Sequence, residues 1–322
     1  MKRMIRSIVF WMVLFFSIPQ TALAAQLLIP GGQLVGVELS NDTVTVAAFD
    51  DICGSVARKA GLQIGDQILS INGREMKNAE DVRQALKDCG EQANLTVLRG
   101  NKTLELKVRP ADTKEGPRLG VYLRQGIAGV GTVTFYDPEK DIFGTLGHGV
   151  NDGKGMLLGM TRGTACDASV ASVRKGKPGD PGQLKGNADE KDVLGQITKN
   201  TPQGVFGISR TGFSGEPLPV AAYEDVTIGP ARIRSTVSGD RVREYSVEIL
   251  KIYPQDRSDC RNFLIRVTDP ELLKATGGIV QGMSGSPIIQ DGKLVGAVTH
   301  VLVNDPTRGY GIFIENMLEA AE

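Results

Sequence analysis

Short stretches of alternating hydrophobic and polar residues, separated by glycine-rich turns, make up most of the chain. They occur at residues 43–49, 65–73, 93–99, 103–108, 131–136, 168–173 and 245–250. Helical spacing appears within residues 79–88, where Val82, Ala85 and Leu86 stand at i, i+3 and i+4. Many short strands with few helical patterns predict a mostly β protein.

A tight turn and a helix organise the first third of the chain. Residues 60–73 read A-G-L-Q-I-G-D-Q-I-L-S-I-N-G and end in Asn-Gly, which favours a β-hairpin turn. With the helix at 79–88 and the strands around it, this run resembles a bacterial PDZ domain covering residues 27–110. The resemblance implies an α+β domain whose groove accepts a peptide as an added strand. It places the carboxylate-binding loop at Leu34, Val35, Gly36 and Val37, although Gly36 is also compatible with an ordinary turn.

The N-terminus has the pattern of an export signal. Lys2, Arg3 and Arg6 precede an apolar run at residues 8–18, and a small-residue stretch follows up to Ala25. The run falls short of the ~20 residues that span a bilayer. We therefore expect residues 1–25 to be a signal peptide or an N-terminal membrane anchor, and the remainder to be exported.

Charge and cysteine content narrow the classes of function. Lysine plus arginine and aspartate plus glutamate both number 37, so the chain lacks the basic field that holds nucleic acid. Four cysteines suit an exported protein: Cys53–Cys89 and Cys166–Cys260 are possible disulfides, and free thiols are the open alternative. No C-x-x-C pair occurs, so we expect no metal and no cofactor.

Residues 118–322 form a second expected domain, after a polar, turn-rich linker at 111–117. Within it, residues 282–287 read G-M-S-G-S-P and are followed by a β-hairpin pattern. This run resembles the nucleophile loop of trypsin-like peptidases, in which glycines allow a tight bend and backbone N–H groups converge on one point. The match implies Ser284 as the nucleophile and the N–H groups of Gly282 and Ser284 as the oxyanion hole. Ser286 is the lesser candidate, expected to pack beside the bend.

The chain has only two histidines, which limits the choice of general base. His148 lies between glycines after a strand-like segment, where a base would be exposed at a turn. His300 lies inside an apolar strand, a position more typical of a half-buried packing residue. The order of His148 before Ser284 agrees with trypsin-like barrels. We therefore predict His148 as the base. The resemblance to trypsin-like enzymes further implies that His300, Thr299 and residues 309–311 line the substrate cleft.

Several longer stretches resemble the stage IV sporulation protein B peptidases of spore-forming Firmicutes. They lie at 129–138, 146–149, 268–273 and 276–289. The resemblance implies a PDZ domain followed by a trypsin-like double β-barrel serine peptidase, secreted between forespore and mother cell. There, such enzymes cleave themselves and a regulator of a membrane-embedded protease, which triggers a sigma-factor switch. Membrane proximity and PDZ control by a peptide or the chain's own N-terminal region are also implied.

The acid that orients His148 is open in the sequence. The family resemblance implies Asp269, although an aspartate before proline is also typical of a helix cap or turn. A trypsin-like order favours a position nearer the histidine, such as Asp192.

Two other functions are compatible with these features. A non-catalytic PDZ adaptor with a degenerate peptidase domain is one, and the paired Ser284 and His148 argue against it. A general quality-control protease is the other. Such proteases usually carry the PDZ domain after the protease domain, whereas here the PDZ pattern comes first.

Overall fold

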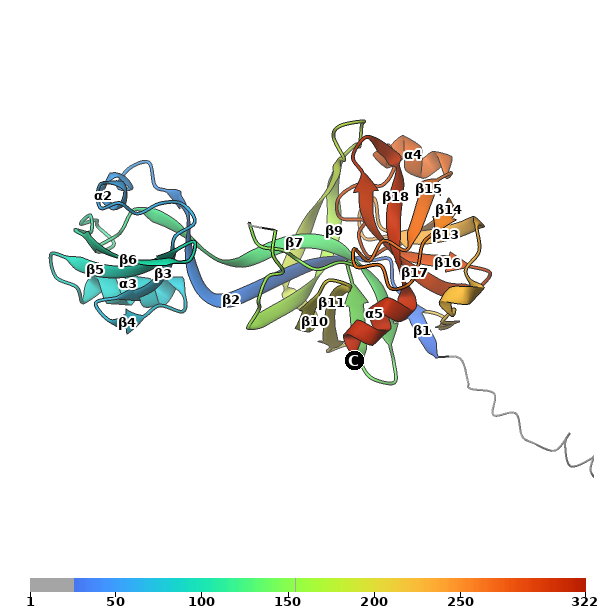
Figure 1. The fold of residues 1–322 in the computed structure, drawn as a ribbon, viewed down its shortest axis with the longest axis horizontal. Coiled ribbons are helices and arrows are strands. Elements are labelled where there is room, and N and C mark those ends of the chain that lie inside the picture. Colours follow the sequence, from blue (N-terminus) through green and yellow to red (C-terminus); the bar gives the residue numbers. More distant parts are fainter. Residues whose placement is uncertain (1–25, 154) are drawn as a thin grey trace, which may run out of the picture.

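The computed structural model describes residues 26–153 and 155–322. Figure 1 shows a smaller body at the left and a larger one at the right, joined by the paired strands β2 (Leu34–Phe49) and β7 (Val121–Asp137). Strands dominate both bodies, which confirms the mostly β prediction. Within the described residues no helix has the length and apolar character needed to cross a membrane. The predicted export segment, residues 1–25, lies outside them.

Six strands of the larger body close into a first barrel. Besides β2 and β7 they are β8 (Ile142–Thr145), β9 (Arg162–Arg174), β10 (Gln183–Thr201) and β11 (Gly204–Ser209). The pairing runs from β2 through β7, β8, β11, β10 and β9 and returns to β2. Because side chains alternate across a strand, residues such as Val35, Val133 and Phe143 fill the interior and are fully buried.

The second barrel is formed by the last six strands of the chain. They are β13 (Gly229–Ser235), β14 (Arg243–Ile252), β15 (Phe263–Val267), β16 (Pro287–Gln290), β17 (Lys293–Leu302) and β18 (Asp305–Phe313). They close in the order β13-β14-β15-β18-β17-β16 around a core that contains Ile233, Val247 and Phe263. The predicted double β-barrel is therefore present.

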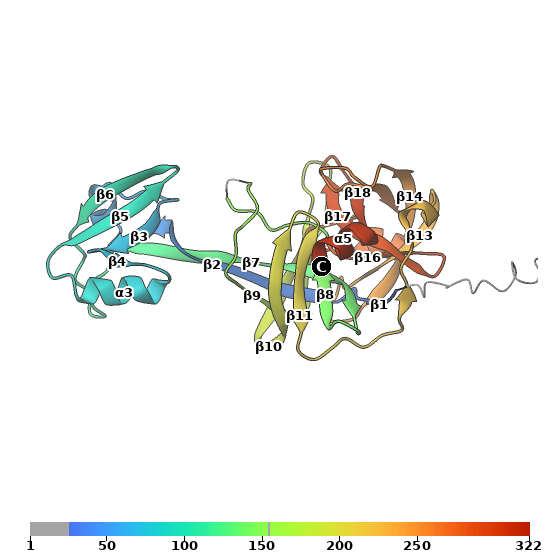
Figure 2. The same ribbon diagram turned by 60° about the horizontal axis from the view of Figure 1, so that its bottom comes forward.

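Short elements join the two barrels. β1 (Leu27–Pro30) pairs with β7 and with β12 (Leu218–Pro219). The C-terminal helix α5 (Ile314–Ala321) buries Met317 in a cluster with Phe206 of the first barrel and Leu294 of the second. Figure 2 shows this helix beside strands of both barrels, which are thereby held as one body. The helix α4 (Pro270–Thr276) and a 3₁₀ turn (Tyr223–Asp225) complete this unit.

The smaller body is the predicted PDZ unit. Its elements are α2 (Ser55–Lys59), β3 (Gln67–Ile71), β4 (Arg74–Glu75), α3 (Ala79–Lys87), β5 (Ala93–Arg99) and β6 (Lys102–Val108). Asn72 and Gly73 have positive φ values of 51° and 80°, as the predicted hairpin turn requires. The side chain of Asn78 caps α3 by accepting the N–H of Asp81 at 2.8 Å.

Strand pairing divides the chain differently from the predicted boundaries of 27–110, 111–117 and 118–322. Residues 34–40 of β2 pair with β7 and β9 in the first barrel, whereas residues 44–45 pair with β3 of the PDZ unit. The PDZ unit is therefore inserted between two adjacent barrel strands. The 16 residues of β2 extend about 50 Å at ~3.3 Å per residue. One unbroken strand thus takes part in both the barrel and the PDZ sheet. The sequence pattern of this strand therefore does not show where the barrel ends and the PDZ unit begins.

Neither disulfide considered from the sequence is formed. Cys53 and Cys89 are separate thiols in the PDZ unit, and burial raises the pKa of both. Cys166 is buried on β9, whereas Cys260 packs beside α5. The described fold is held together by its hydrophobic clusters and by strand pairing.

Candidate active site

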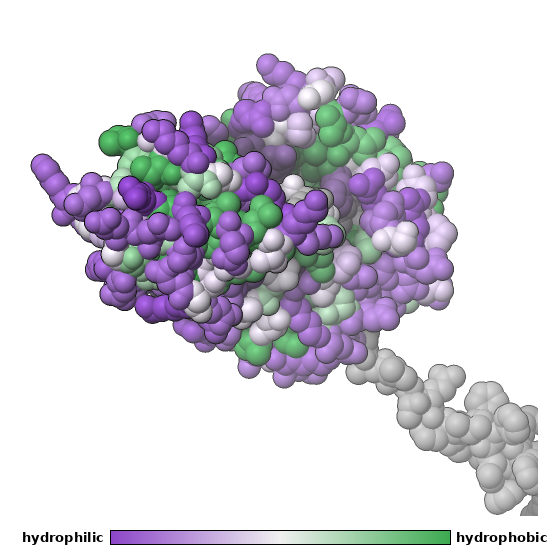
Figure 3. Space-filling view, turned by 60° about the vertical axis from the view of Figure 1, so that its left-hand side comes forward, coloured by the Kyte–Doolittle hydropathy of each residue, from purple (hydrophilic) through white to green (hydrophobic). Residues whose placement is uncertain are grey.

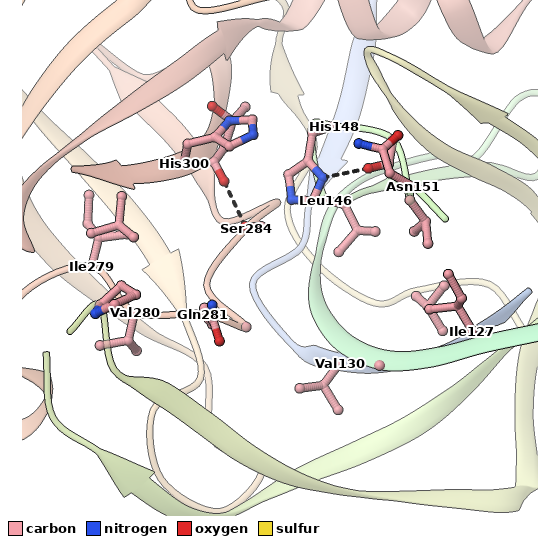
Figure 4. A pocket seen from close by; sticks show the side chains of 18 of the residues that line it. Ile127, Val130, Leu146, His148, Asn151, Ile279, Val280, Gln281, Ser284 and His300 are labelled. Carbon is pink, nitrogen blue, oxygen red and sulfur yellow. Dashed lines mark hydrogen bonds between the residues drawn. The ribbon is translucent and has the colours of Figure 1, made fainter. Parts of the chain in front are cut away.

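A cleft of about 850 Å³ lies between the two barrels and contains both predicted catalytic side chains. Leu146 and His148 reach it from the end of β8 in the first barrel. Ser284 reaches it from the loop before β16, and Thr299 and His300 from β17, in the second barrel. Figure 4 shows His148, His300 and Ser284 around one side of this space. Residues 136 positions apart in the sequence are thus brought into one site.

The loop that carries Ser284 bends where glycine is required. Gly282 and Gly285 have φ values of 98° and 95°, which L side chains rarely adopt. A Cβ atom on Gly285 would lie 2.0 Å from the carbonyl oxygen of Thr132, so no larger residue fits. The sequence motif therefore encodes the bend directly.

The first barrel holds this loop in place. The N–H of Thr132 donates to the Ser284 carbonyl at 2.9 Å, and the Thr132 hydroxyl donates to the Gly282 carbonyl at 2.9 Å. The hydroxyl of Thr134 donates to the Gly285 carbonyl at 2.8 Å. These contacts across the barrels fix the nucleophile loop relative to His148. No sequence pattern singled out Thr132 or Thr134.

The predicted oxyanion hole consists of the backbone N–H groups of Gly282 and Ser284. Among the described residues neither group has an acceptor, whereas the intervening N–H of Met283 donates to the Val280 carbonyl at 3.1 Å. Both N–H groups are therefore available to an incoming oxyanion. Ser286, by contrast, is buried with its hydroxyl 3.1 Å from that of Ser235, which confirms its packing role.

His148 is oriented by a backbone carbonyl. Leu146 and Gly147 both have positive φ, so the chain turns sharply before the histidine. The Nδ1 atom of His148 lies 2.9 Å from the carbonyl oxygen of Gly149, which can only accept a hydrogen bond. The proton therefore sits on Nδ1, and Nε2 is left as the basic nitrogen. Burial lowers the pKa of His148 from its usual 6.5, which keeps the base neutral.

The hydroxyl of Ser284 donates to the carbonyl oxygen of Thr299 at 2.7 Å. His148 is therefore not its hydrogen-bond partner in this state. Catalytic hydrogen bonds often tighten only when substrate binds. The Thr299 carbonyl is thus an additional site feature that the sequence did not indicate as an acceptor for the nucleophile.

Neither candidate acid reaches His148. Asp269 caps α4: its carboxylate accepts the N–H of Leu272 at 3.0 Å and that of Ser246 at 3.3 Å. Asp192 is exposed on β10. Neither carboxylate lines the cleft. The assignment of Asp269 to the triad is therefore wrong for this geometry, because local helix capping occupies the side chain.

His300 lies beside His148, with ring centroids 5.0 Å apart and a tilt of 40° between the rings. Burial, and secondarily the neighbouring His148, lowers the pKa of His300 to about 4. The predicted positions of His300 and Thr299 along the cleft are confirmed, whereas residues 309–311, predicted beside them, are not among the lining residues. Both histidines are therefore neutral near pH 7.

The match to known families agrees with this geometry. Residues 115–318 match the model of the SpoIVB peptidase S55 family, and residues 52–99 match a PDZ domain. The chain belongs to the SpoIVB peptidase S55 family. It is therefore a serine endopeptidase with a PDZ unit, and the S55 region contains Ser284 and His148.

Other similarities of this S55 peptidase are partial. Mitochondrial serine protease HTRA2 of Drosophila erecta is 40% identical over 73 residues, which are 23% of this chain and 17% of HTRA2. HTRA2 of Drosophila virilis is 41% identical over 67 residues, 21% of this chain and 16% of that protein. The chain thus spans less than a fifth of the curated relatives it matches.

Solved structures are similar at low identity. The active form of the Rv3671c protease of M. tuberculosis is 17% identical, with a TM-score of 0.36, and the alignment covers 61% of this chain and 74% of that chain. The HtrA-type protease AlgW with decapeptide is 13% identical, with a TM-score of 0.34, over 65% of this chain and 57% of that chain.

The peptide-binding assignment in the PDZ unit of the S55 peptidase is wrong. Leu34, Val35, Gly36 and Val37 lie inside the first barrel: all four pair with β7 on one edge, and the last three also pair with β9 on the other. A Cβ atom on Gly36 would lie 2.6 Å from that of Ala188, so this glycine serves barrel packing. Because both strand edges are occupied, no peptide can add there.

The groove of the PDZ unit lies between α3 and residues 118–123 instead. Residues 121–124 of β7 pair with β2 along one edge and have α3 on the other side. Residues 118–121 read R-L-G-V, which is similar to the L-V-G-V of residues 34–37. This second stretch is the sequence feature that could have located the groove. Figure 3, with the PDZ unit toward the viewer, shows a mostly hydrophilic surface interrupted by hydrophobic patches.

Proposed function

We propose that this S55 peptidase is an exported signalling endopeptidase of sporulation. It cleaves itself and a regulatory protein, and thereby activates a membrane-embedded protease and sigma-factor processing. The observation that carries this proposal is the meeting of Ser284 and His148 in one cleft of the S55 region. The sporulation role itself follows from the family resemblance.

The site residues can perform acyl transfer in two steps. His148 Nε2 accepts the Ser284 proton as Oγ attacks the scissile carbonyl, and the N–H groups of Gly282 and Ser284 bind the oxyanion. The protonated histidine then donates that proton to the leaving amine, and water hydrolyses the acyl-enzyme in the reverse sense. Before attack, Oγ must leave the Thr299 carbonyl. The Gly149 carbonyl keeps the base in the required tautomer.

The proposed location is the space between forespore and mother cell, with the enzyme near the membrane before self-cleavage. The export pattern of residues 1–25 supports this location. The proposed ligand of the PDZ groove is a peptide or the chain's own N-terminal region, because β7 has an edge beside α3 at which a strand can add.

Removal of the nucleophile tests the proposal. We expect Ser284→Ala to lower the cleavage rate by about 10⁵-fold or more, as removal of such a serine does elsewhere. The full chain would be labelled with a fluorophosphonate and its self-cleavage followed on gels. Ser286→Ala is the matched control, since this serine lies in the same loop but its hydroxyl contacts Ser235.

Labelling of the parent and of Ser286→Ala, but not of Ser284→Ala, is the expected pattern. An unlabelled parent, also in the presence of substrate, would favour the adaptor alternative. The signalling role is tested by co-expressing the parent or Ser284→Ala with a membrane-embedded protease and its regulator. Equal processing by both chains would contradict that role.

A further inference from the structure

The cleft is lined without a single charged side chain among the described residues. Its aliphatic lining residues are Val37, Ile127, Val130, Leu146, Val150, Leu157, Ile279, Val280, Val301 and Val303. The polar groups that accompany them, such as Asn151, Gln281 and Thr299, are uncharged. Because burial keeps His148 and His300 neutral, the cleft has no net charge near pH 7.

The wall next to the nucleophile loop is aliphatic and closed. Ile279 and Val280 are each only 2% exposed. The Cδ1 atom of Ile279 would lie 2.5 Å from a Cβ atom on Gly309, so the isoleucine side chain fills the space above this β18 glycine. Ile279 therefore limits how deep a substrate side chain can enter beside Ser284.

The backbone opposite this wall can pair with a substrate. His300 and Val301 of β17 pair with Tyr310 and Gly309 of β18, while the pairing of β17 with β16 covers only residues 293–297. Residues 299–301 therefore have one edge without a partner strand, on which the Thr299 carbonyl accepts the Ser284 hydroxyl, and they line the cleft. An extended peptide can add along this edge, which directs its side chains toward the aliphatic wall.

We propose that the cleft selects an uncharged, aliphatic segment of its protein substrate, and that Ile279 sets the size of the residue accepted before the scissile bond. This inference rests on the endopeptidase function proposed above. Alanine, valine and leucine fit a shallow aliphatic pocket. Lysine, arginine, aspartate and glutamate would each bury a charge that no described lining residue can pair.

A peptide series tests this selection. The parent full chain would be given internally quenched peptides that differ only in the residue before the scissile bond. We expect kcat/KM for the valine, leucine or alanine peptide to exceed that for the lysine or aspartate peptide at least ~100-fold. One extra or missing methylene in an apolar pocket already changes kcat/KM about 10–200-fold, and burying a charge costs more. Equal values for lysine, aspartate and valine would overturn the proposal.

Substitution of Ile279 tests its role separately. We expect Ile279→Ala to raise the ratio of the phenylalanine peptide to the valine peptide at least about tenfold, since a deeper pocket opens. The matched control is Ile233→Ala, at a fully buried position in the same core cluster but outside the cleft lining. Ile233→Ala should lower cleavage of the phenylalanine and valine peptides by the same factor, because partial unfolding reduces the amount of active enzyme and leaves the ratio of the two rates constant.

The outcomes separate the two proposals. A parent chain that neither reacts with a fluorophosphonate nor cleaves any peptide contradicts the endopeptidase function. A parent that reacts at Ser284 but cleaves lysine or aspartate peptides as fast as aliphatic ones contradicts only the selection. An unchanged phenylalanine-to-valine ratio in Ile279→Ala removes Ile279 as the residue that determines size.

Discussion

The two peptide sites of this chain differ most in charge. Among the described residues the cleft between the barrels has no charged lining residue, whereas the PDZ groove has five: Asp50, Arg83, Lys87, Glu115 and Arg118. The groove can therefore discriminate peptides by charge, at a surface where ionic groups stay hydrated. The cleft discriminates by exclusion of charge.

Both sites are nevertheless built on one strand. Residues 121–123 of β7 line the groove, and Ile127, Gly129 and Val130 of the same strand line the cleft. A ligand added to β7 in the groove is thus connected to the cleft by continuous backbone. Variants that affect one site and spare the other test whether the two act independently.

The largest expected effect separates the two histidines of the cleft. We expect His148→Ala to lower kcat/KM by about 10⁵-fold, comparable to loss of the serine, because His148 is the base that accepts the Ser284 proton in the proposed mechanism. His300→Ala should keep most of the activity, since His300 is a wall residue beside the base. Single-turnover cleavage of the valine peptide measures both.

The groove provides the internal control for these variants. The probe is a fluorescent peptide with the sequence of residues 16–25, taken from the N-terminal region proposed as a groove ligand. His148→Ala and His300→Ala should both bind it as tightly as the parent does, as measured by fluorescence anisotropy. If His300→Ala loses as much activity as His148→Ala, His300 takes part in the proton transfer and the present assignment of roles is wrong.

A bulky residue in the groove should have an intermediate effect. Ala79 lies at the start of α3, lines the groove and is half-buried. We expect Ala79→Trp to fill the groove and weaken binding of the 16–25 peptide at least about tenfold. Cleavage of short peptides in the cleft should stay unchanged. Binding of that peptide by anisotropy and kcat/KM on the valine peptide are the two measurements.

The neighbouring residue offers a matched control. Glu80 is exposed on the same helix and does not line the groove, so Glu80→Trp should leave peptide binding intact. Equal binding by the parent and Ala79→Trp would show that the 16–25 peptide does not bind between α3 and β7.

The smallest effect concerns pH. His148 works as a base only when neutral, and burial lowers its pKa from 6.5. As pH falls, kcat/KM should therefore persist below pH 6.5 and decline only through the lowered pKa. Peptide binding in the groove should be flat over this range, because the groove lining contains no histidine. A half-maximal rate at or above pH 6.5 would contradict the neutral, buried base.

The sequence predicted those features whose cause is local. Glycines at 282 and 285 encode the bend around Ser284, and Asn72 with Gly73 encodes the PDZ hairpin. With only two histidines, the base followed from the glycine-flanked turn at His148. These predictions depend on residues within a few positions of one another, where backbone sterics decide the conformation.

The features that the sequence missed depend on distant partners. Leu34–Val37 and the similar stretch at 118–121 differ not in pattern but in which strands lie beside them. Asp269 resembles a triad acid by family position, yet the N–H groups of Leu272 and Ser246 take up its carboxylate. The Gly149 carbonyl has no side-chain signature at all.

The insertion of the PDZ unit between β2 and β7 makes it the tip of a long hairpin. Ser40 and Gly126 are paired across this hairpin, so their Cα atoms are close neighbours in the ladder. A short turn in place of residues 41–125 would therefore close the first barrel with little loop-closure entropy. A single deletion in the gene would thus separate the peptidase body. Cutting one described linker would not release it, because two paired strands join the bodies.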